Sequence, residues 1–176
     1  MKKTIGKILY TEEQIRKRAQ ELAAEISRDY EGEEVVVIGT LKGSVMWMCE
    51  LLKHLELDTS IDFISASSYG SGTSTSGVVK FRMDTEMNLY NKNVLVVEDI
   101  VDTGVTLTYV LEKLRERHPK SLKVCTMLDK PARNITGFRA DYNGFEIDDL
   151  FVIGFGLDYD QKYRDLPYIS YLQGEE

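Results

Sequence analysis

The stretch VLVVEDIVDTGVTLTYVLEKL, from Val94 to Leu114, joins an apolar run, a cluster of acids and a periodic helix. The four apolar residues Val94 to Val97 predict a buried strand, and the two acids that follow are expected where the chain leaves the core. Apolar periodicity then predicts a helix over Val105 to Arg117. Open α/β proteins bind ligands at the carboxyl ends of their parallel strands, so this stretch predicts both the fold class and the position of the site.

The flanking sequence alternates strands and helices in the same way. A capping box of Thr11 and Gln14 predicts an amphipathic helix over residues 11–30, and Ser44 is expected to cap a helix that runs to about His54. Apolar or alternating runs predict strands at Val35 to Ile38, Ile61 to Ser65, Val78 to Phe81 and Lys123 to Leu128. This order predicts an α/β fold with a mainly parallel central sheet, flanked by helices and joined by right-handed crossovers.

The pattern changes after Asp129. Short segments around Phe145, Phe151 to Gly154 and Tyr168 to Leu172 are separated by turns, so they predict a small appended lobe. A chain of 176 residues has the size of one ordinary domain, and residues 1–176 are therefore expected to form a single one.

The overall charge is acidic, with 22 Lys and Arg against 29 Asp and Glu and a formal net charge of −7. This balance argues against a protein that binds nucleic acid or an anionic membrane. No run approaches the roughly 18 apolar residues of a membrane span, and Lys2 and Lys3 are not followed by the apolar segment of a signal peptide. We expect a cytoplasmic protein in which Cys49 and Cys125 are reduced residues of the core.

Residues 67–77, SSYGSGTSTSG, are Ser, Thr or Gly except for Tyr69. Such a segment is too polar to pack by itself, and one interpretation is a linker or a hairpin loop. A linker should join two domains, however, and the chain is too small for two ordinary cores. Long loops inside compact domains often close over an active site, so we favour a lid in which Tyr69 contacts the ligand.

The segment from Asp102 to Thr106 suits a phosphate ester. A loop that opens a helix offers free backbone N–H groups, hydroxyl donors and the positive end of the helix dipole, and Gly104 permits the tight turn. Glu98 and Asp99 stand one step away, where carboxylates bind sugar hydroxyls or Mg²⁺. A phosphate beside a diol describes ribose 5-phosphate, with Asp102 the best-placed group for proton transfer. The alternative is an ordinary helix cap with solvated acids, but unpaired charge at the end of a buried strand is costly.

The same stretch, VLVVEDIVDTGVTL, resembles the 5-phosphoribosyl 1-pyrophosphate (PRPP) motif of the type I phosphoribosyltransferases, in which two acids, a third acid and Thr-Gly form the phosphate loop. Further matches are LKGS at Leu41 to Ser44, Ser68-Tyr69 in the polar loop, LDKP at Leu128 to Pro131, and FVIGFGLDYDQKYRDLPY at Phe151 to Tyr168. Together they are similar to the bacterial hypoxanthine-guanine phosphoribosyltransferases. This resemblance implies the type I phosphoribosyltransferase fold, with a small hood over the base site formed mainly by residues 145–176 and N-terminal residues.

The resemblance also implies how PRPP is bound. Glu98 and Asp99 would hold the ribose hydroxyls, directly or through Mg²⁺, and Arg164 would bind pyrophosphate. The full set implied for PRPP or nucleotide binding is Lys42, Gly43, Glu98, Asp99, Asp102, Thr103, Gly104, Val105, Thr106 and Arg164. The Leu41–Lys42 peptide is cis in this family, and Ser68 and Tyr69 would belong to the lid.

The base-binding residues implied by the resemblance are Lys130, Phe151, Val152 and Asp158. Lys130 would donate to O6 of the purine, Phe151 would stack on the ring, and backbone groups of Val152 would read its edge. Asp102 would serve N7 as general base or acid, and Asp158 would bind a second Mg²⁺. From the residue patterns alone, Phe151 and Val152 are core strand residues and Lys130 is a surface lysine, so these roles rest on the resemblance. Residues 131–134 do not match the family's patterns, and Arg133 therefore receives no role.

The implied reaction is purine salvage, in which ribose 5-phosphate passes from PRPP to N9 of hypoxanthine or guanine and pyrophosphate leaves. The implied partners are PRPP, a 6-oxopurine base and Mg²⁺, without nucleic acid or membrane, in a homodimer or homotetramer. Two alternatives stay open. One is a regulatory protein that keeps the fold but binds RNA or DNA, which the acidic charge opposes. The other is a transferase for another base, such as xanthine or a pyrimidine, of which the roles implied for Lys130 and Phe151 oppose the pyrimidine.

Overall fold

The structure, a computed structural model, describes residues 3–68 and 79–174, and its centre is a six-stranded sheet. The strands are β2 (Glu34–Thr40), β3 (Asp58–Ser68), β4 (Val79–Met83), β5 (Asn93–Val101), β6 (Ser121–Asp129) and β7 (Tyr142–Glu146), in the order β4-β3-β2-β5-β6-β7. All neighbouring strands are parallel except the edge strand β4, which is antiparallel to β3. The predicted α/β fold with a mainly parallel sheet is confirmed.

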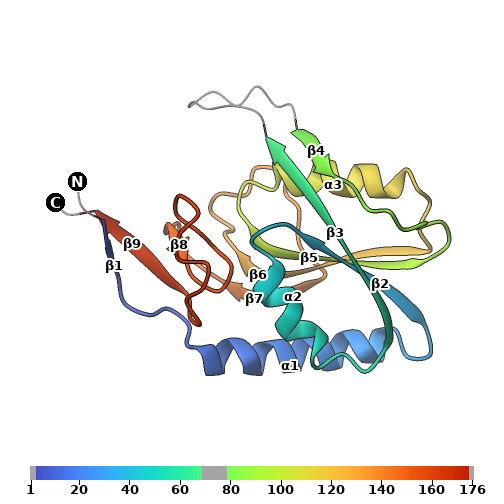
Figure 1. The fold of residues 1–176 in the computed structure, drawn as a ribbon, viewed down its shortest axis with the longest axis horizontal. Helices are drawn as coiled ribbons and strands as arrows, with labels where there is room; N and C mark the ends of the chain where they lie inside the picture. The colour runs from blue at the N-terminus through green and yellow to red at the C-terminus, as the bar shows by residue number, and fades with distance from the viewer. Residues whose placement is uncertain (1–2, 69–78, 175–176) are drawn as a thin grey trace.

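Helices cover both faces of this sheet (Figure 1). The helices α1 (Glu12–Asp29) and α2 (Val45–Leu52) lie on one face, and α3 (Val105–Arg115) lies on the other. The predicted capping box begins α1, whose buried stripe consists of Ile15, Ala19, Leu22, Ala23 and Ile26. Because apolar residues of β2 and β5 face both ways, the sheet separates two hydrophobic clusters, one under each helical layer.

A second, smaller sheet lies at one end of the molecule. It contains β1 (Lys3–Ile5), β9 (Ser170–Gly174) and β8 (Val152–Ile153) in that order, with antiparallel pairing throughout. Figure 1 shows β1 and β9 side by side at the left edge of the molecule, and we call this smaller sheet the hood sheet.

The segment around Phe145 does not join the appended lobe, as the sequence pattern had predicted. It forms β7, which pairs with β6 in parallel, so that Phe145 stands opposite Leu128. A β-carbon on Gly144 would lie 2.3 Å from the backbone oxygen of Met127, and this close approach lets the strand add to the main sheet. The ring of Phe145 stacks on the ring of Tyr10, with the two centroids 4.0 Å apart.

Two smaller expectations need correction. Ser44 precedes α2, but its hydroxyl donates to the carbonyl of Thr40 at 2.7 Å and makes no capping bond. Cys125 is buried as expected, whereas Cys49 is exposed because it lies on the outer face of α2; both are free thiols. Trp47, on the same helix, is fully buried and therefore serves the core. Within the described residues, no helix is long and apolar enough to cross a membrane.

Candidate active site

The two acids of the PRPP motif lie inside strand β5 and do not follow its end. The strand continues to Val101 because it still pairs with β6, but its pairing with β2 stops at Val97. Glu98 and Asp99 therefore stand where β5 has lost one neighbour. Glu98 accepts a hydrogen bond from the Thr40 hydroxyl at 2.6 Å, which fixes its carboxylate at this edge.

The loop after β2 packs directly against these acids. The peptide between Leu41 and Lys42 is cis, as the resemblance implied. A β-carbon on Gly43 would lie 1.5 Å from Oδ2 of Asp99, and one on Gly156 would lie 2.0 Å from the Gly43 carbonyl oxygen. Gly43 is thus enclosed between β5 and the loop that follows β8, and only glycine fits there.

The predicted phosphate loop surrounds a small hollow. A cavity of about 160 Å³ is lined by Glu98, Ile100, Val101, Asp102, Thr103, Gly104, Thr106 and Leu107. Gly104 has a φ of +81°, and a β-carbon there would meet the Thr136 hydroxyl oxygen at 2.2 Å. Helix α3 begins at Val105, so its first N–H groups and the positive end of its dipole lie at the hollow. This is the geometry of an anion site.

A second group of polar side chains gathers between the loop after β2 and the loop that follows β8. Arg164 pairs with Asp158, with its Nη2 2.8 Å from Oδ1, and donates through Nη1 to the Gly156 carbonyl at 2.6 Å. The amide oxygen of Gln161 accepts from Lys42 Nζ at 3.2 Å and from Arg164 Nη2 at 3.3 Å. Two cations from distant parts of the chain therefore share one acceptor, an arrangement suited to a polyanion.

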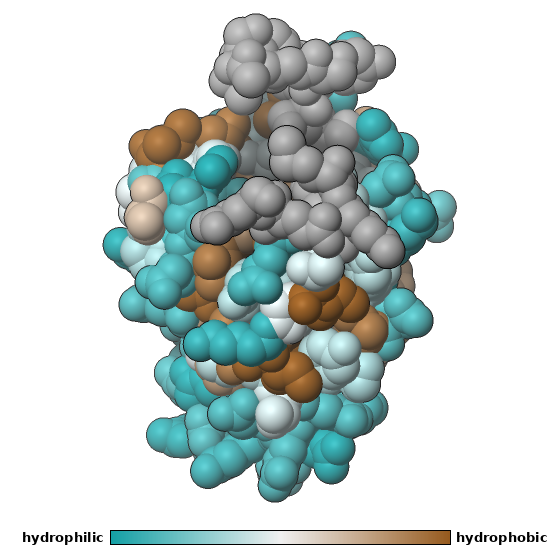
Figure 2. Space-filling model, turned by 90° about the vertical axis from the view of Figure 1, so that its left-hand side faces the viewer, coloured by the Kyte–Doolittle hydropathy of each residue, from teal (hydrophilic) through white to brown (hydrophobic). Residues whose placement is uncertain are grey.

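The base-binding candidates follow the ends of β6 and the start of β8. Lys130 is only 7% exposed and is therefore not a surface lysine; its N–H donates to the Val101 carbonyl at 2.9 Å. Phe151 is 52% exposed, so it is not a core residue either, and its ring lies nearly perpendicular to that of Tyr159, with the centroids 5.6 Å apart. Val152 is buried within β8. Figure 2 shows apolar side chains exposed among polar ones at this hood end.

The electrostatics of the acid pair suit a cation. Removal from water, reinforced by the charge of Asp99, holds the pKa of Glu98 well above its usual range. Removal from water also raises the pKa of Asp99, against the opposing influence of hydrogen bonds and of the Arg164 charge. Among the described residues no group of three or more His, Cys, Asp or Glu forms a complete metal site. Two carboxylates still fit Mg²⁺, which commonly takes one or two from the protein and the rest from phosphates and water.

The structure adds two residues that sequence reasoning missed. Gln161 connects Lys42 with Arg164, and nothing in its sequence surroundings signals this. Arg133, which had received no role, lies with Nε 3.0 Å from Oδ1 of Asp102. Ser68 ends β3, whereas Tyr69 and the rest of the predicted lid lie outside the described residues, so the lid stays a prediction.

Comparisons with known proteins agree with this geometry. Residues 6–160 match the model of the phosphoribosyl transferase domain. A hypoxanthine-guanine phosphoribosyltransferase of Bacillus subtilis is 43% identical over 173 residues, covering 98% of this chain and 96% of that one. A crystal structure of such an enzyme from Bacillus anthracis superposes with a TM-score of 0.91 at 44% identity, covering 98% of this chain and all of the other. A hypoxanthine phosphoribosyltransferase of Staphylococcus aureus gives a TM-score of 0.93 at 44% identity, covering 96% and 92% of the two chains.

Proposed function

This chain belongs to the phosphoribosyltransferase family, and on that premise we propose that it is a purine salvage enzyme. It transfers ribose 5-phosphate from PRPP to N9 of hypoxanthine or guanine, which gives IMP or GMP and pyrophosphate. The observation that carries the proposal is the meeting of an acid pair, an anion hollow and a bridged pair of cations at one edge of the sheet.

The hollow at the start of α3 takes the 5-phosphate. Thr103 and Thr106 line the hollow with hydroxyl-bearing side chains, and the start of α3 places its N-terminal N–H groups and the positive end of its dipole beside the phosphate. Glu98 lines the hollow and Asp99 follows it in β5, on the side where the ribose diol would extend. Their carboxylates accept hydrogen bonds from the two hydroxyls or hold Mg²⁺ that does so.

Pyrophosphate lies on the other side of the acid pair. Lys42 and Arg164 exchange their shared Gln161 oxygen for phosphate oxygens, and the enclosed loop at Gly43 brings backbone close to the anion. Glu98, Asp99 and Asp158 are the residues that would hold Mg²⁺. The metal, when bound, neutralises charge on the pyrophosphate and so makes it a better leaving group.

The purine occupies the space beside the hollow, toward the hood. The ammonium of Lys130 donates to O6, Phe151 offers an exposed ring for stacking, and the Val152 backbone reads the edge of the base. Asp102 lies at the boundary between the phosphate and base regions. It accepts or returns the proton at N7 while N9 attacks the ribose.

Catalysis by these residues is mainly electrostatic. As the bond to pyrophosphate breaks, positive charge develops on the ribose ring, and the carboxylates of Glu98 and Asp99 lie on the side that stabilises it. Lys42 and Arg164 stabilise the negative charge that accumulates on the leaving group. Because Lys42 and Arg164 are already held close together by Gln161 before the substrate binds, little reorganisation is needed once pyrophosphate has replaced that contact.

The decisive assay follows ultraviolet absorbance with hypoxanthine, guanine, xanthine, adenine and uracil, each with PRPP and with Mg²⁺ either present or chelated. Turnover of hypoxanthine or guanine only with Mg²⁺ is the expected result, and it ranks the 6-oxopurines. Absence of turnover with every base, while PRPP still binds, would refute the enzyme and favour the regulatory alternative.

Location and assembly complete the proposal. A cytoplasmic enzyme agrees with the two free thiols. A homodimer or homotetramer agrees with exposed Ile5 and Ile8 near the hood and Met46 on α2, which offer apolar surface for a second copy. Sedimentation equilibrium at several protein concentrations distinguishes these states, and a monomer at all of them would contradict the assembly.

A further inference from the structure

Arg133 lies between two acids that come from different loops of the site. Its Nε is 3.0 Å from Oδ1 of Asp102 in the phosphate loop. Its Nη1 is 3.7 Å from Oδ1 of Asp149, which stands two residues before Phe151. The guanidinium thus connects the proposed proton-transfer group with the segment that carries the proposed stacking ring.

The turn that carries Arg133 is fastened to the end of β5. The Lys130 N–H donates to the Val101 carbonyl at 2.9 Å, and the Ile135 N–H donates to the Thr103 carbonyl at 3.1 Å. Within the turn, the Arg133 N–H donates to the Lys130 carbonyl at 3.0 Å. These two hydrogen bonds, which flank Arg133 in sequence, hold its backbone against β5 and the loop that follows β5.

The two oxygens of the Asp102 carboxylate have different surroundings. Oδ1 is buried and forms an ion pair with Arg133 without hydrogen-bond geometry, whereas the Asp102 side chain as a whole is 41% exposed. Because Oδ1 is buried, the exposed part of the carboxylate lies on the side of Oδ2. The guanidinium fixes one oxygen and leaves the other available to a ligand.

We propose that Arg133 is a positioning residue that orients Asp102 for proton transfer at N7 of the purine, an inference that rests on the proposed role of Asp102. Arg133 cannot exchange the proton itself, because a guanidinium keeps its charge throughout the working pH range. It acts by holding the rotamer in which Oδ2 is free. Asp149 holds the other edge of the guanidinium and so restricts its motion.

The size of the effect follows from exposure. The Arg133 side chain is 46% exposed, so water weakens the attraction but leaves the geometric restraint. Loss of orientation at a reacting group costs up to roughly 10²-fold, and for this half-exposed pair we expect roughly a tenfold loss of kcat. The KM for PRPP should change by less than about twofold, because the ion pairs of Arg133 within the described residues are with Asp102 and Asp149, of which only Asp102 is a proposed PRPP ligand.

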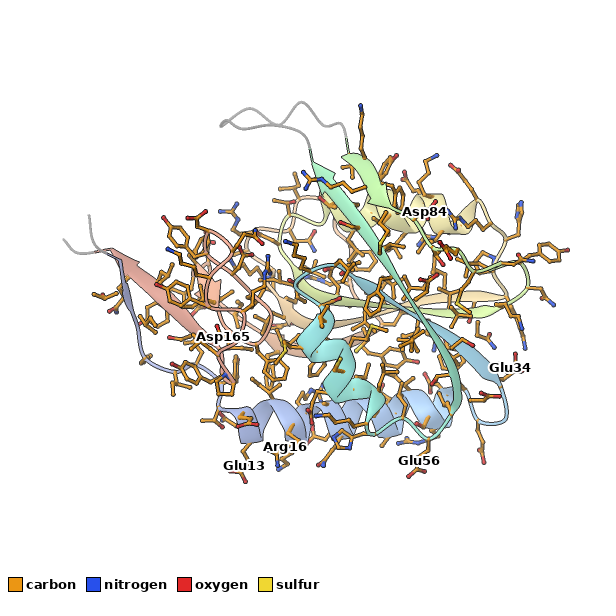
Figure 3. The ribbon with its side chains drawn as sticks, in the orientation of Figure 1. Glu13, Arg16, Glu34, Glu56, Asp84 and Asp165 are labelled. Atoms are coloured by element: carbon orange, nitrogen blue, oxygen red, sulfur yellow. The ribbon has the colours of Figure 1, made fainter. Side chains whose placement is uncertain are left out.

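The experiment is a double-mutant cycle of Arg133→Gln and Asp102→Asn, assayed with hypoxanthine and saturating PRPP. Arg133→Gln should lower kcat about tenfold in the wild-type background and by less than about twofold in the Asp102→Asn background, since its effect passes through that carboxylate. Arg133→Lys should recover part of the loss because it keeps a positive charge at Oδ1. Arg16→Gln is the matched control: it removes an exposed arginine from an ion pair with Glu12, on the side of α1 that points away from the sheet (Figure 3).

Each result has a distinct meaning. Equal losses of kcat from Arg133→Gln in both backgrounds, or no loss in either, would overturn the positioning role. Unchanged kcat in Asp102→Asn alone would refute the proposed role of Asp102 and, with it, that of Arg133. A raised KM for PRPP with unchanged kcat would also overturn the proposal, since it would make Arg133 a substrate ligand. Thermal unfolding of every variant separates these outcomes from a loss of folded protein.

Discussion

Gly43 and Asp99 are in contact so close that a β-carbon on the glycine would lie 1.5 Å from the carboxylate oxygen Oδ2. The loop after β2 and the acid pair of β5 are consequently one unit, although Gly43 and Asp99 lie 56 positions apart in the sequence. Any side chain at position 43 must displace the carboxylate that is proposed to hold ribose and Mg²⁺.

Gly43→Ala is therefore expected to lower kcat/KM for PRPP by at least roughly tenfold, and to destabilise the fold by about 1–3 kcal/mol through overpacking. Urea unfolding and steady-state kinetics measure the two effects. The control is Gly32→Ala, where the left-handed φ of +77° adds strain but no atom lies within 4 Å. It should lose stability and keep activity. Full activity in Gly43→Ala would show that Asp99 can move without consequence.

Lys130→Ala should weaken binding of the base more than binding of PRPP. A hydrogen bond from a charged donor contributes about 1.5–3 kcal/mol, so the KM for hypoxanthine should rise roughly 10- to 10²-fold. Steady-state kinetics with each substrate varied in turn provide the measurement. Lys120→Ala, which removes an exposed lysine paired with Glu33, should change neither KM. Equal losses for both substrates would mean that Lys130 does not read O6.

Glu98→Gln should stabilise the ligand-free protein at alkaline pH. The pKa of Glu98 is raised in the folded protein above its ordinary value of 4.5, so the stability that the protonated acid provides is complete below pH 4.5 and is lost as pH rises through the raised pKa. Glutamine is neutral at all pH values and keeps the acceptor for Thr40. We expect Glu98→Gln to gain about 0.5–2 kcal/mol at pH 8, with a smaller gain at pH 5.

Urea unfolding at the two pH values measures this difference, with Glu116→Gln on the exposed end of α3 as the control. PRPP binding should weaken in Glu98→Gln at the same time, because a charged ligand is lost. A variant less stable than wild type at both pH values would contradict the stated origin of the raised pKa.

Alkylation should distinguish the two thiols. Burial raises the pKa of the Cys125 thiol to about 12, so at pH 8 only about one molecule in 10⁴ carries the thiolate that reacts. Iodoacetamide should label exposed Cys49 in the native protein and Cys125 only after unfolding in urea, as mass spectrometry of peptides would show. Cys49→Ser should abolish native labelling. Rapid labelling of Cys125 in that variant would show that the core opens more readily than its packing indicates.

Much of the fold could be predicted because its signals are local. The apolar runs of β2 and β5 and the capping box at Thr11 each determine structure through neighbours in sequence. The strand β7 could not be placed, because Phe145 joins the main sheet through a close approach of Gly144 to Met127, and no local pattern reports that contact.

The candidate site likewise contains a part that is local in sequence and a part that depends on contacts between distant residues. The phosphate loop from Asp102 to Thr106 is contiguous, so its chemistry could be read from the sequence. The partnership of Arg133 with Asp102 and that of Gln161 with Lys42 join residues far apart in the chain. For two residues the local pattern predicted the wrong environment. It placed Lys130 on the surface, where the structure buries it, and Phe151 in the core, where the structure exposes its ring.

The pairing of β1 with β9 determines when, during synthesis, the protein can first bind its base. Lys3 pairs with Gly174, so β1 must wait for β9, which is synthesised 171 residues later, before the two strands can pair. At about 5–20 residues per second this delay is roughly 10–30 s. The main sheet and its helices can assemble during that interval, but the hood sheet that holds Val152 cannot. A nascent chain could therefore form the phosphate hollow before it can recognise a purine, so that base recognition is the last function to be acquired during synthesis.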